Sequence, residues 1–173
     1  GDIVQALNEA SAGKHFEEFK DINSLPEDSG RRVITTGGHF GYLKIAEGCD
    51  KHCTYCIIPS LRGSFRSVPE ERLLAQAEYM ASQGVKELIL VAQETTVYGT
   101  DLYGKKTLHL LLKKLCQIKG IRWIRILYCY PEEIYDELIQ VMKEEKKICH
   151  YLDLPIQHCS DRILKRMGRR TSK

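Results

Sequence analysis

Apolar residues occur in two alternating patterns along the chain. Short, nearly continuous apolar runs predict β-strands, and stretches with apolar residues every three or four positions predict amphipathic helices. Strands are expected at 42–46, 85–92, 121–128 and 149–155, and helices after Ser67 and at 107–119, 131–143 and 160–167. Strands that alternate with helices at this spacing predict an α/β fold, with about four right-handed β/α units on a parallel sheet.

Local signals add detail to these elements. Ser67 and Glu70 have the spacing of a capping box at the start of a helix, with Pro69 in the first turn. The continuous apolar run at 85–92 is typical of a strand buried on both faces of a parallel sheet. In the helix at 131–143, the residues expected to point inward are Ile134, Leu138, Ile139 and Met142.

The first forty residues differ from the rest of the chain. Residues 2–10 have helical spacing of apolar positions, and residues 11–30 are polar and include Pro26 and Gly30, which is typical of a linker. We therefore expect residues 1–41 to be the end of a preceding domain and a linker. Residues 42–173 are expected to form a core that is truncated on its carboxyl-terminal side, because the last predicted helix is followed by no turn signal.

Three cysteines, Cys49, Cys53 and Cys56, follow the first predicted strand with the spacing C-x-x-x-C-x-x-C. Thiolates favour soft or borderline metals, so an iron–sulfur cluster or zinc is expected here. Four cysteines normally close an electron-transfer cluster, and the local run supplies three, which favours a 4Fe–4S cluster with one open iron. A zinc site completed by His52 is the alternative, although structural zinc sites usually combine two short ligand pairs.

The carboxyl ends of parallel strands meet at one edge of the sheet, where β/α barrels place their site-building loops. The cysteine loop follows the first strand, so residues 93–96, 128–130 and 157–158 are expected on the same face. Cys116 and Cys149 are expected to be core thiols. Cys129 and Cys159 also fall near strand ends, and their roles, like that of His158, stay open.

Composition narrows the protein class. The chain has 173 residues, 43% of them hydrophobic and 28% charged, which suits a folded domain of ordinary size. Its formal charge of +3 permits a partner rich in nucleic acid without requiring one. Seven cysteines, with no signal peptide and no long apolar span, predict a cytoplasmic protein without membrane association.

The cysteine spacing, with Tyr55 beside the last cysteine, resembles the radical S-adenosylmethionine (radical SAM) superfamily. Further motifs resemble its methylthiotransferase branch, most closely the members that modify a ribosomal protein. They lie at 42–49, 56–60, 62–63, 66–67, 87–96, 98–99, 101–104, 130–131 and 153–158. The tRNA-modifying relatives tend to have Met where this chain has Ala46, and Gly-Gln-Asn at 92–94. The resemblance implies a partial (βα) barrel of the radical SAM type.

The resemblance also implies an activity. A 4Fe–4S cluster held by Cys49, Cys53 and Cys56 would cleave S-adenosylmethionine to a 5′-deoxyadenosyl radical, and Tyr55, Gln93 and Gln157 would contact the cofactor. The enzyme would be a transferase that inserts sulfur and a methyl group at the β-carbon of an aspartate on a small-subunit ribosomal protein. No catalytic side chain is assigned.

The same resemblance implies partners. They are the small-subunit ribosomal protein or the ribosome, an electron donor such as flavodoxin or ferredoxin, and a second cluster in an amino-terminal domain. Two alternatives remain: a tRNA methylthiotransferase acting on a modified adenosine, and a zinc-stabilised ribosome-binding module without enzymatic activity.

Overall fold

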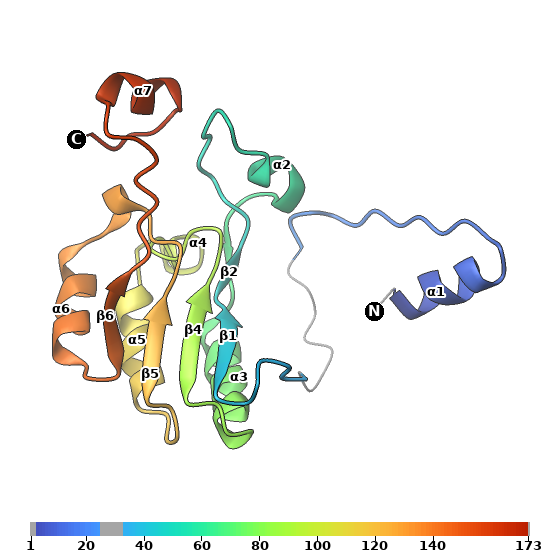
Figure 1. Cartoon of the computed structure of the whole chain (residues 1–173), viewed down its shortest axis with the longest axis horizontal. Helices are drawn as coiled ribbons and strands as arrows, with labels where there is room; N and C mark the ends of the chain where they lie inside the picture. The colour runs from blue at the N-terminus through green and yellow to red at the C-terminus, as the bar shows by residue number, and fades with distance from the viewer. Residues whose placement is uncertain (1–2, 25–32, 173) are drawn as a thin grey trace.

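The computed structural model describes residues 3–24 and 33–172. Its centre is a four-stranded parallel sheet whose strands lie in the order in which they occur along the chain, as Figure 1 shows. The strands are β1 (Phe40–Lys44), β4 (Glu87–Val91), β5 (Trp123–Ile126) and β6 (Ile148–Leu152). The helices between them are α3 (Glu70–Ser82), α5 (Leu108–Cys116) and α6 (Asp136–Glu144). This arrangement confirms the predicted α/β fold.

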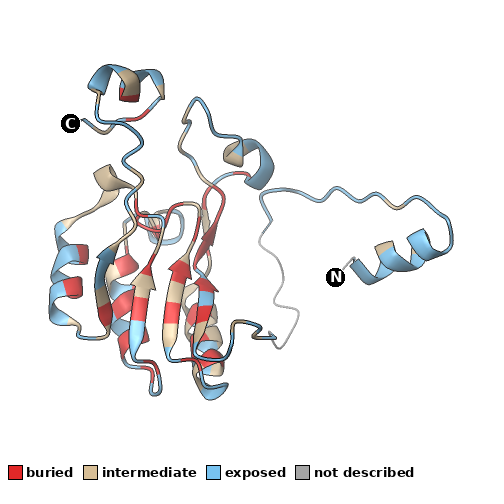
Figure 2. Ribbon diagram, in the orientation of Figure 1, coloured by how far each residue is buried: buried red, intermediate tan, exposed pale blue. Residues whose placement is uncertain are grey.

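The core lies between the sheet and these three helices. Alternate residues of β1, β4 and β5 point into it and are buried, as the red bands in Figure 2 show. Apolar side chains on one face of each helix fill the layer from the other side. The main members are Leu43, Leu88, Leu90, Ile124, Ile126, Leu73, Met80, Leu111, Leu115, Leu138 and Val141.

The prediction that the run at 85–92 is buried on both faces was wrong. In β4, Leu88 and Leu90 are fully buried, whereas Ile89 and the two terminal residues of the strand are only partly buried. The neighbouring strands repeat this alternation, and Tyr42 beside Ile89 is exposed. The helices cover one face of the sheet, so the apolar side chains of the second face stay partly or largely exposed.

The predicted capping box was also wrong. Helix α3 starts at Glu70, directly after Pro69, and no side chain caps its first turn. Ser67 instead belongs to β3 (Arg66–Ser67), which pairs antiparallel with β2 (Ala46–Glu47). Its backbone N–H and its hydroxyl both donate to the carboxylate of Asp101, at 2.8 and 2.6 Å. Ser67 therefore makes two charge-assisted hydrogen bonds to Asp101 in place of the expected bond to the first turn of α3.

The helix expected at 131–143 is divided in two. A 3₁₀ turn (η1, Pro131–Glu133) comes first, and α6 begins at Asp136 after two extended residues. The buried face of α6 consists of Leu138, Val141 and Met142, so Leu138 and Met142 are inward as expected. Ile139 lies outside this face and is 46% exposed, so its prediction was wrong.

Four short elements were not predicted. They are the β2–β3 pair, α2 (Ile58–Arg62) and α4 (Thr100–Tyr103). Each has only two to five residues, which is too short to produce a periodic pattern. Helix α7 (Asp161–Arg166) lies where the last predicted helix was expected and is shorter than predicted.

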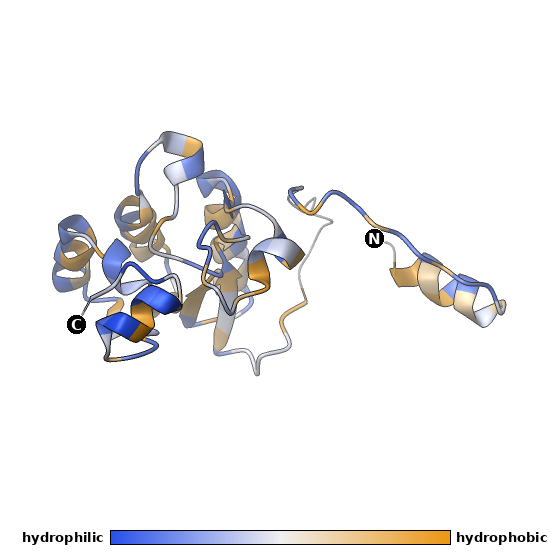
Figure 3. Ribbon diagram, turned by 90° about the horizontal axis from the view of Figure 1, so that it is seen from above, coloured by the Kyte–Doolittle hydropathy of each residue, from blue (hydrophilic) through white to orange (hydrophobic). Residues whose placement is uncertain are grey.

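The amino-terminal helix α1 (Ile3–Ser11) lies apart from the sheet (Figures 1 and 3). Its residues Ile3, Val4 and Leu7 are all more than half exposed. Of the predicted linker, residues 11–24 contain no helix or strand beyond the end of α1, and residues 25–30 lie outside the described residues. Over the described residues, no helix has the length and apolar character needed to cross a membrane.

Candidate functional site

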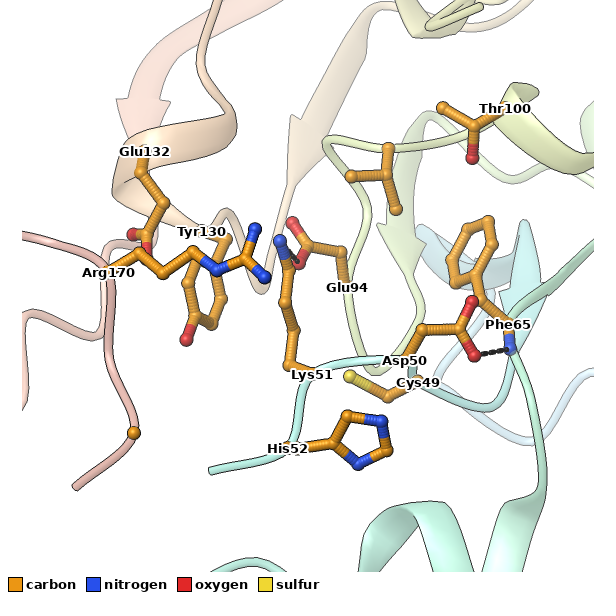
Figure 4. Close-up of a pocket in the computed structure, with 12 residues that line it drawn as sticks. Cys49, Asp50, Lys51, His52, Phe65, Glu94, Thr100, Tyr130, Glu132 and Arg170 are labelled. Carbon is orange, nitrogen blue, oxygen red and sulfur yellow. Dashed lines mark hydrogen bonds and ion pairs between the residues drawn. The ribbon is translucent and has the colours of Figure 1, made fainter. Parts of the chain in front are cut away.

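A cavity of about 270 Å³ lies beyond the carboxyl ends of the strands. Four segments contribute to its wall: the chain between β2 and β3, which includes the cysteine loop, the chain after β4, the loop after β5, and the turn after α7 (Figure 4). The lining residues are Cys49, Asp50, Lys51, His52, Phe65, Glu94, Val97, Thr100, Tyr130, Glu132, Gly168 and Arg170. The strand-end face predicted from the sequence is therefore hollowed, and the cysteine loop forms part of the hollow.

Gly48 turns the chain from β2 into the cysteine loop. Its φ of +77° is in the left-handed region, and a Cβ at this position would overlap the backbone carbonyl of Ser64. The next residues are tied to the same neighbouring segment. The Cys49 N–H donates to the carbonyl of Gly63 at 3.2 Å, and the Asp50 carboxylate accepts from the N–H of Phe65 at 3.0 Å. These contacts fix the start of the loop.

The three thiols of the loop differ in their surroundings. Cys49 is partly buried at the cavity wall, and this burial raises the pKa of its thiol. Cys53 is also partly buried, and its Sγ lies 3.4 Å from the phenol oxygen of Tyr130. Cys56 is exposed. All three therefore lie along one loop that borders the cavity.

No group of three or more His, Cys, Asp or Glu side chains within residues 3–24 and 33–172 is gathered so as to hold a single metal ion. A zinc ion requires its ligands about 2.0–2.3 Å from one point. A cubane cluster spreads its thiolates over separate irons, so it does not require the sulfurs to converge on one point. The donor set, three thiols on one loop, fits such a cluster.

The far side of the loop is attached to the end of α7. The Thr54 N–H donates to the carbonyl of Met167 at 3.0 Å, and the Thr54 hydroxyl donates to that of Arg166 at 3.2 Å. Gly168 follows with a φ of +72°, and a Cβ there would lie 2.9 Å from the carbonyl oxygen of His52. The cysteine loop is therefore held between two segments that are far apart in sequence.

This contact gives a prediction for Gly168→Ala. The left-handed φ alone should cost about 1–2 kcal/mol of unfolding free energy, and the contact with His52 should add to that cost and displace the loop. Gly104→Ala is the matched control, because Gly104 has a φ of +67° and no atom within 4 Å of the added Cβ. Urea unfolding should show a larger loss for Gly168→Ala, with reduced iron uptake on reconstitution. Equal losses and equal iron contents in the two variants would contradict the proposed contact.

Glu94 is the most deeply buried charged group of the cavity wall. It is 1% exposed, and Figure 4 shows its side chain and that of Lys51 pointing toward each other. The Lys51 Nζ is 3.7 Å from Glu94 Oε2, and the Thr96 hydroxyl donates to Oε1. Burial raises the pKa of Glu94 despite these two neighbours. Oε2 is buried, is ion-paired with Lys51 and accepts no hydrogen bond from the described residues, so the cavity wall contains a carboxylate oxygen with unused acceptor capacity.

Positive charge also approaches the cavity. Lys51 forms an ion pair with Glu133, which in turn pairs with Lys106 at 2.8 Å. Arg170, from the turn after α7, lines the same cavity. The wall therefore combines a buried carboxylate with cations on its rim, an arrangement suited to a ligand that carries both an ammonium and a carboxylate group.

The model of the Radical SAM superfamily matches residues 43–173. This segment contains β4, β5 and β6 of the parallel sheet, the last two residues of β1, the cysteine loop and every residue that lines the cavity. The chain belongs to the radical SAM superfamily.

Among curated proteins, this radical SAM chain is similar to the ribosomal protein uS12 methylthiotransferase RimO of Lachnoclostridium phytofermentans, at 65% identity over 98% of the chain. It is 60% identical to the protein of the same name from Clostridium botulinum, over 99% of the chain. The chain spans 39% and 37% of the length of these two relatives. The resemblance predicted from the sequence motifs is thereby confirmed.

Solved structures support the fold. The radical SAM methyltransferase TsrM from Kitasatospora setae has a TM-score of 0.60 at 14% identity, over 77% of this chain and 26% of that one. The cobalamin-dependent radical SAM enzyme OxsB has a TM-score of 0.59 at 19% identity, over 76% of this chain and 20% of that one. Both likenesses confirm a partial barrel of the radical SAM type.

The structure distributes the predicted cofactor-binding residues of the radical SAM chain unevenly. Gln93 does not line the cavity, although its Oε1 is buried without a hydrogen-bond partner. Tyr55 is 52% exposed, on the cysteine loop. Gln157 and His158 are exposed and are not among the residues that line the cavity, so a contact of Gln157 with the cofactor stays a prediction. The chain after β6 carries them past the cavity wall.

Glu94 and Tyr130 were not assigned to the site from the sequence, although both line the cavity. Both lie in loops at the carboxyl ends of strands, where the site was expected. The loops were therefore predictable, but which residue of each loop lines the cavity was not. Of the other thiols, Cys116 and Cys129 belong to the core, Cys149 is partly buried and Cys159 is exposed. The prediction of a core thiol is thereby confirmed for Cys116 and was wrong for Cys149, which is only partly buried in β6 and lies outside the core cluster.

Proposed function

We propose that this chain is the radical-generating core of a methylthiotransferase whose substrate is an aspartate side chain of a small-subunit ribosomal protein. The observation that carries the proposal is the three-thiol loop at the mouth of the cavity, in a chain 65% identical to a protein named for modifying uS12. The ribosome, an electron donor of the flavodoxin or ferredoxin class, and a cytoplasmic location belong to the same proposal.

The residues of the cavity fit the two cofactors that this function requires. Cys49, Cys53 and Cys56 would hold a 4Fe–4S cluster through three irons and leave the fourth for S-adenosylmethionine. The cluster, when bound, supplies the electron that cleaves this cofactor. Oε2 of Glu94, which is ion-paired with Lys51 but accepts no hydrogen bond from the described residues, would accept one from the cofactor's ammonium group. Phe65 and Val97 provide apolar contacts in the same wall.

Anaerobic reconstitution with iron and sulfide tests the proposal directly. We expect a brown protein with absorption near 400 nm and about four irons per chain. After reduction with dithionite, it should convert S-adenosylmethionine to 5′-deoxyadenosine and methionine, measured by liquid chromatography and mass spectrometry. A colourless protein that binds one zinc ion would instead support the ribosome-binding module.

The acceptor of the methylthio group is tested separately, with a protein as long as the curated relatives. It should thiomethylate ribosomal protein uS12 in small subunits and leave tRNA unmodified, as mass spectrometry of both substrates would show. Modification of an adenosine in tRNA, with uS12 unchanged, would overturn the choice of acceptor while keeping the radical chemistry.

Glu94→Gln should weaken binding of S-adenosylmethionine. Hydrogen bonds to charged groups contribute about 1.5–3 kcal/mol, so the dissociation constant should rise roughly 10- to 100-fold. Calorimetric titration of the cluster-loaded protein measures this, with the absorption spectrum confirming an intact cluster. Glu47→Gln is the control, because Glu47 is also buried, with an unpartnered Oε1, but lies outside the cavity wall. An unchanged affinity in Glu94→Gln would show that this carboxylate does not contact the cofactor.

A further inference from the structure

Tyr130 makes a contact that the proposed function does not explain. Its phenol oxygen lies 3.4 Å from Sγ of Cys53, a hydrogen-bonding distance for sulfur. The two residues are 77 positions apart, and the contact joins the loop after β5 to the cysteine loop. When Cys53 is a thiolate, it has no proton to donate, so the phenol must be the donor.

The backbone and the ring of Tyr130 are both fixed. Its N–H donates to the hydroxyl of Thr96 at 3.2 Å, in the loop after β4, and Pro131 follows it in the chain. The Arg169 guanidinium carbon is 3.7 Å from the ring centroid, and Lys51 Nζ is 4.7 Å from it. These cations come from the turn after α7 and from the cysteine loop, so three separate segments determine where the phenol points.

Arg169 is itself held firmly. Its side chain is 2% exposed, donates to the carbonyl of Pro155 at 3.0 Å and lies 3.8 Å from Glu132. A buried guanidinium against an aromatic ring withdraws electron density from the ring. This makes the phenol a stronger hydrogen-bond donor.

We propose that Tyr130 is a positioning residue that donates a hydrogen bond to the Cys53 thiolate and thereby raises the reduction potential of the cluster bound at this loop. The inference rests on the proposed function, because it presupposes a cluster at the three cysteines. One electron from an external reductant enters the cluster, and no proton moves. Reduction adds negative charge to the cluster sulfurs, so a donor aimed at one of them stabilises the reduced form more than the oxidised form.

Tyr130→Phe isolates this effect, because it removes the hydroxyl and keeps the ring, its cation contacts and the backbone hydrogen bond. In a redox titration of the reconstituted protein followed by electron paramagnetic resonance, we expect the ratio of reduced to oxidised cluster at a fixed potential to fall about tenfold. For a one-electron couple this corresponds to about 59 mV. The control is Tyr128→Phe, since Tyr128 is an exposed tyrosine two residues away in the same loop.

A second measurement does not depend on how Tyr130→Phe folds. Incorporating 3-fluorotyrosine at position 130 makes the phenol a stronger donor, so the same ratio should rise. Cluster-loaded protein whose potential is unchanged in both variants would overturn the inference, as would a shift of equal size in Tyr128→Phe. Wild-type protein that takes up no cluster would instead refute the proposed function, so the two failures can be told apart.

Discussion

Cys53→Ala should abolish assembly of the cluster and, with it, reductive cleavage of S-adenosylmethionine. Two remaining thiolates cannot hold a cubane that normally requires at least three protein ligands and one from the cofactor. Iron content after anaerobic reconstitution should fall from about four per chain to background. Cys53 is a suitable choice because its sulfur contacts the phenols of Tyr130 and Tyr55 and is not part of the hydrophobic core, so its loss should leave the fold intact.

Two control variants make this result interpretable. Cys159→Ala removes an exposed thiol outside the loop and should keep the full iron content. His52→Ala should also keep it, because His52 is exposed and the cluster needs no histidine. Loss of metal in His52→Ala would favour the zinc alternative, and about four irons in Cys53→Ala would refute the cluster assignment.

The periodic parts of the fold were predictable from the sequence. The four parallel strands and the helices α3, α5 and α6 each contain enough apolar positions to define a period, and all of them lie close to their predicted ranges. The prediction failed where tertiary contacts decide the outcome. Ser67 has the sequence signature of a helix cap, but Asp101, 34 residues later, takes both of its donors.

The burial of the sheet shows the same limit. A continuous apolar run such as that of β4 shows only that its residues are apolar. Whether both faces of the strand are covered depends on where the other elements lie. In the described part of the chain, α3, α5 and α6 pack on one face. Ile89 therefore remains partly exposed while its neighbours Leu88 and Leu90 are fully buried.

The position of the site followed from topology, and its individual residues did not. Glu94 and Tyr130 both lie in loops at the carboxyl ends of parallel strands, where a site is expected. Adjacent residues such as Gln93 and Glu94 point in different directions, so the sequence does not show which of them enters the cavity. The loops after the strands also do not all line one cavity. The exposed segment with Gln157, which has a φ of +63°, departs from the wall instead.

Gly48→Ala should have the largest effect of any single methyl group added near the site. The left-handed φ costs about 1–2 kcal/mol for a residue with a Cβ. The overlap with the Ser64 carbonyl adds to this, because the obstacle is backbone and cannot rotate away. The N–H of Ser64 in turn donates a hydrogen bond to the Asn23 side chain at 3.1 Å, so displacing Ser64 also disturbs the segment that contains Asn23.

To relieve this overlap, the chain at Gly48 must move away from the chain at Ser64. These two segments are joined by the antiparallel pairing of β2 with β3, at Ala46 with Ser67 and at Glu47 with Arg66. That separation would also break the hydrogen bond from Cys49 to Gly63 and leave the first thiol unplaced. We therefore expect Gly48→Ala to lower the urea midpoint and to lose most of its iron on reconstitution. Gly38→Ala is the matched control, with a φ of +82° and no atom within 4 Å of the added Cβ. If both variants lose stability equally and both load a full cluster, the turn at Gly48 does not position Cys49, because conformational strain alone would then explain the effect.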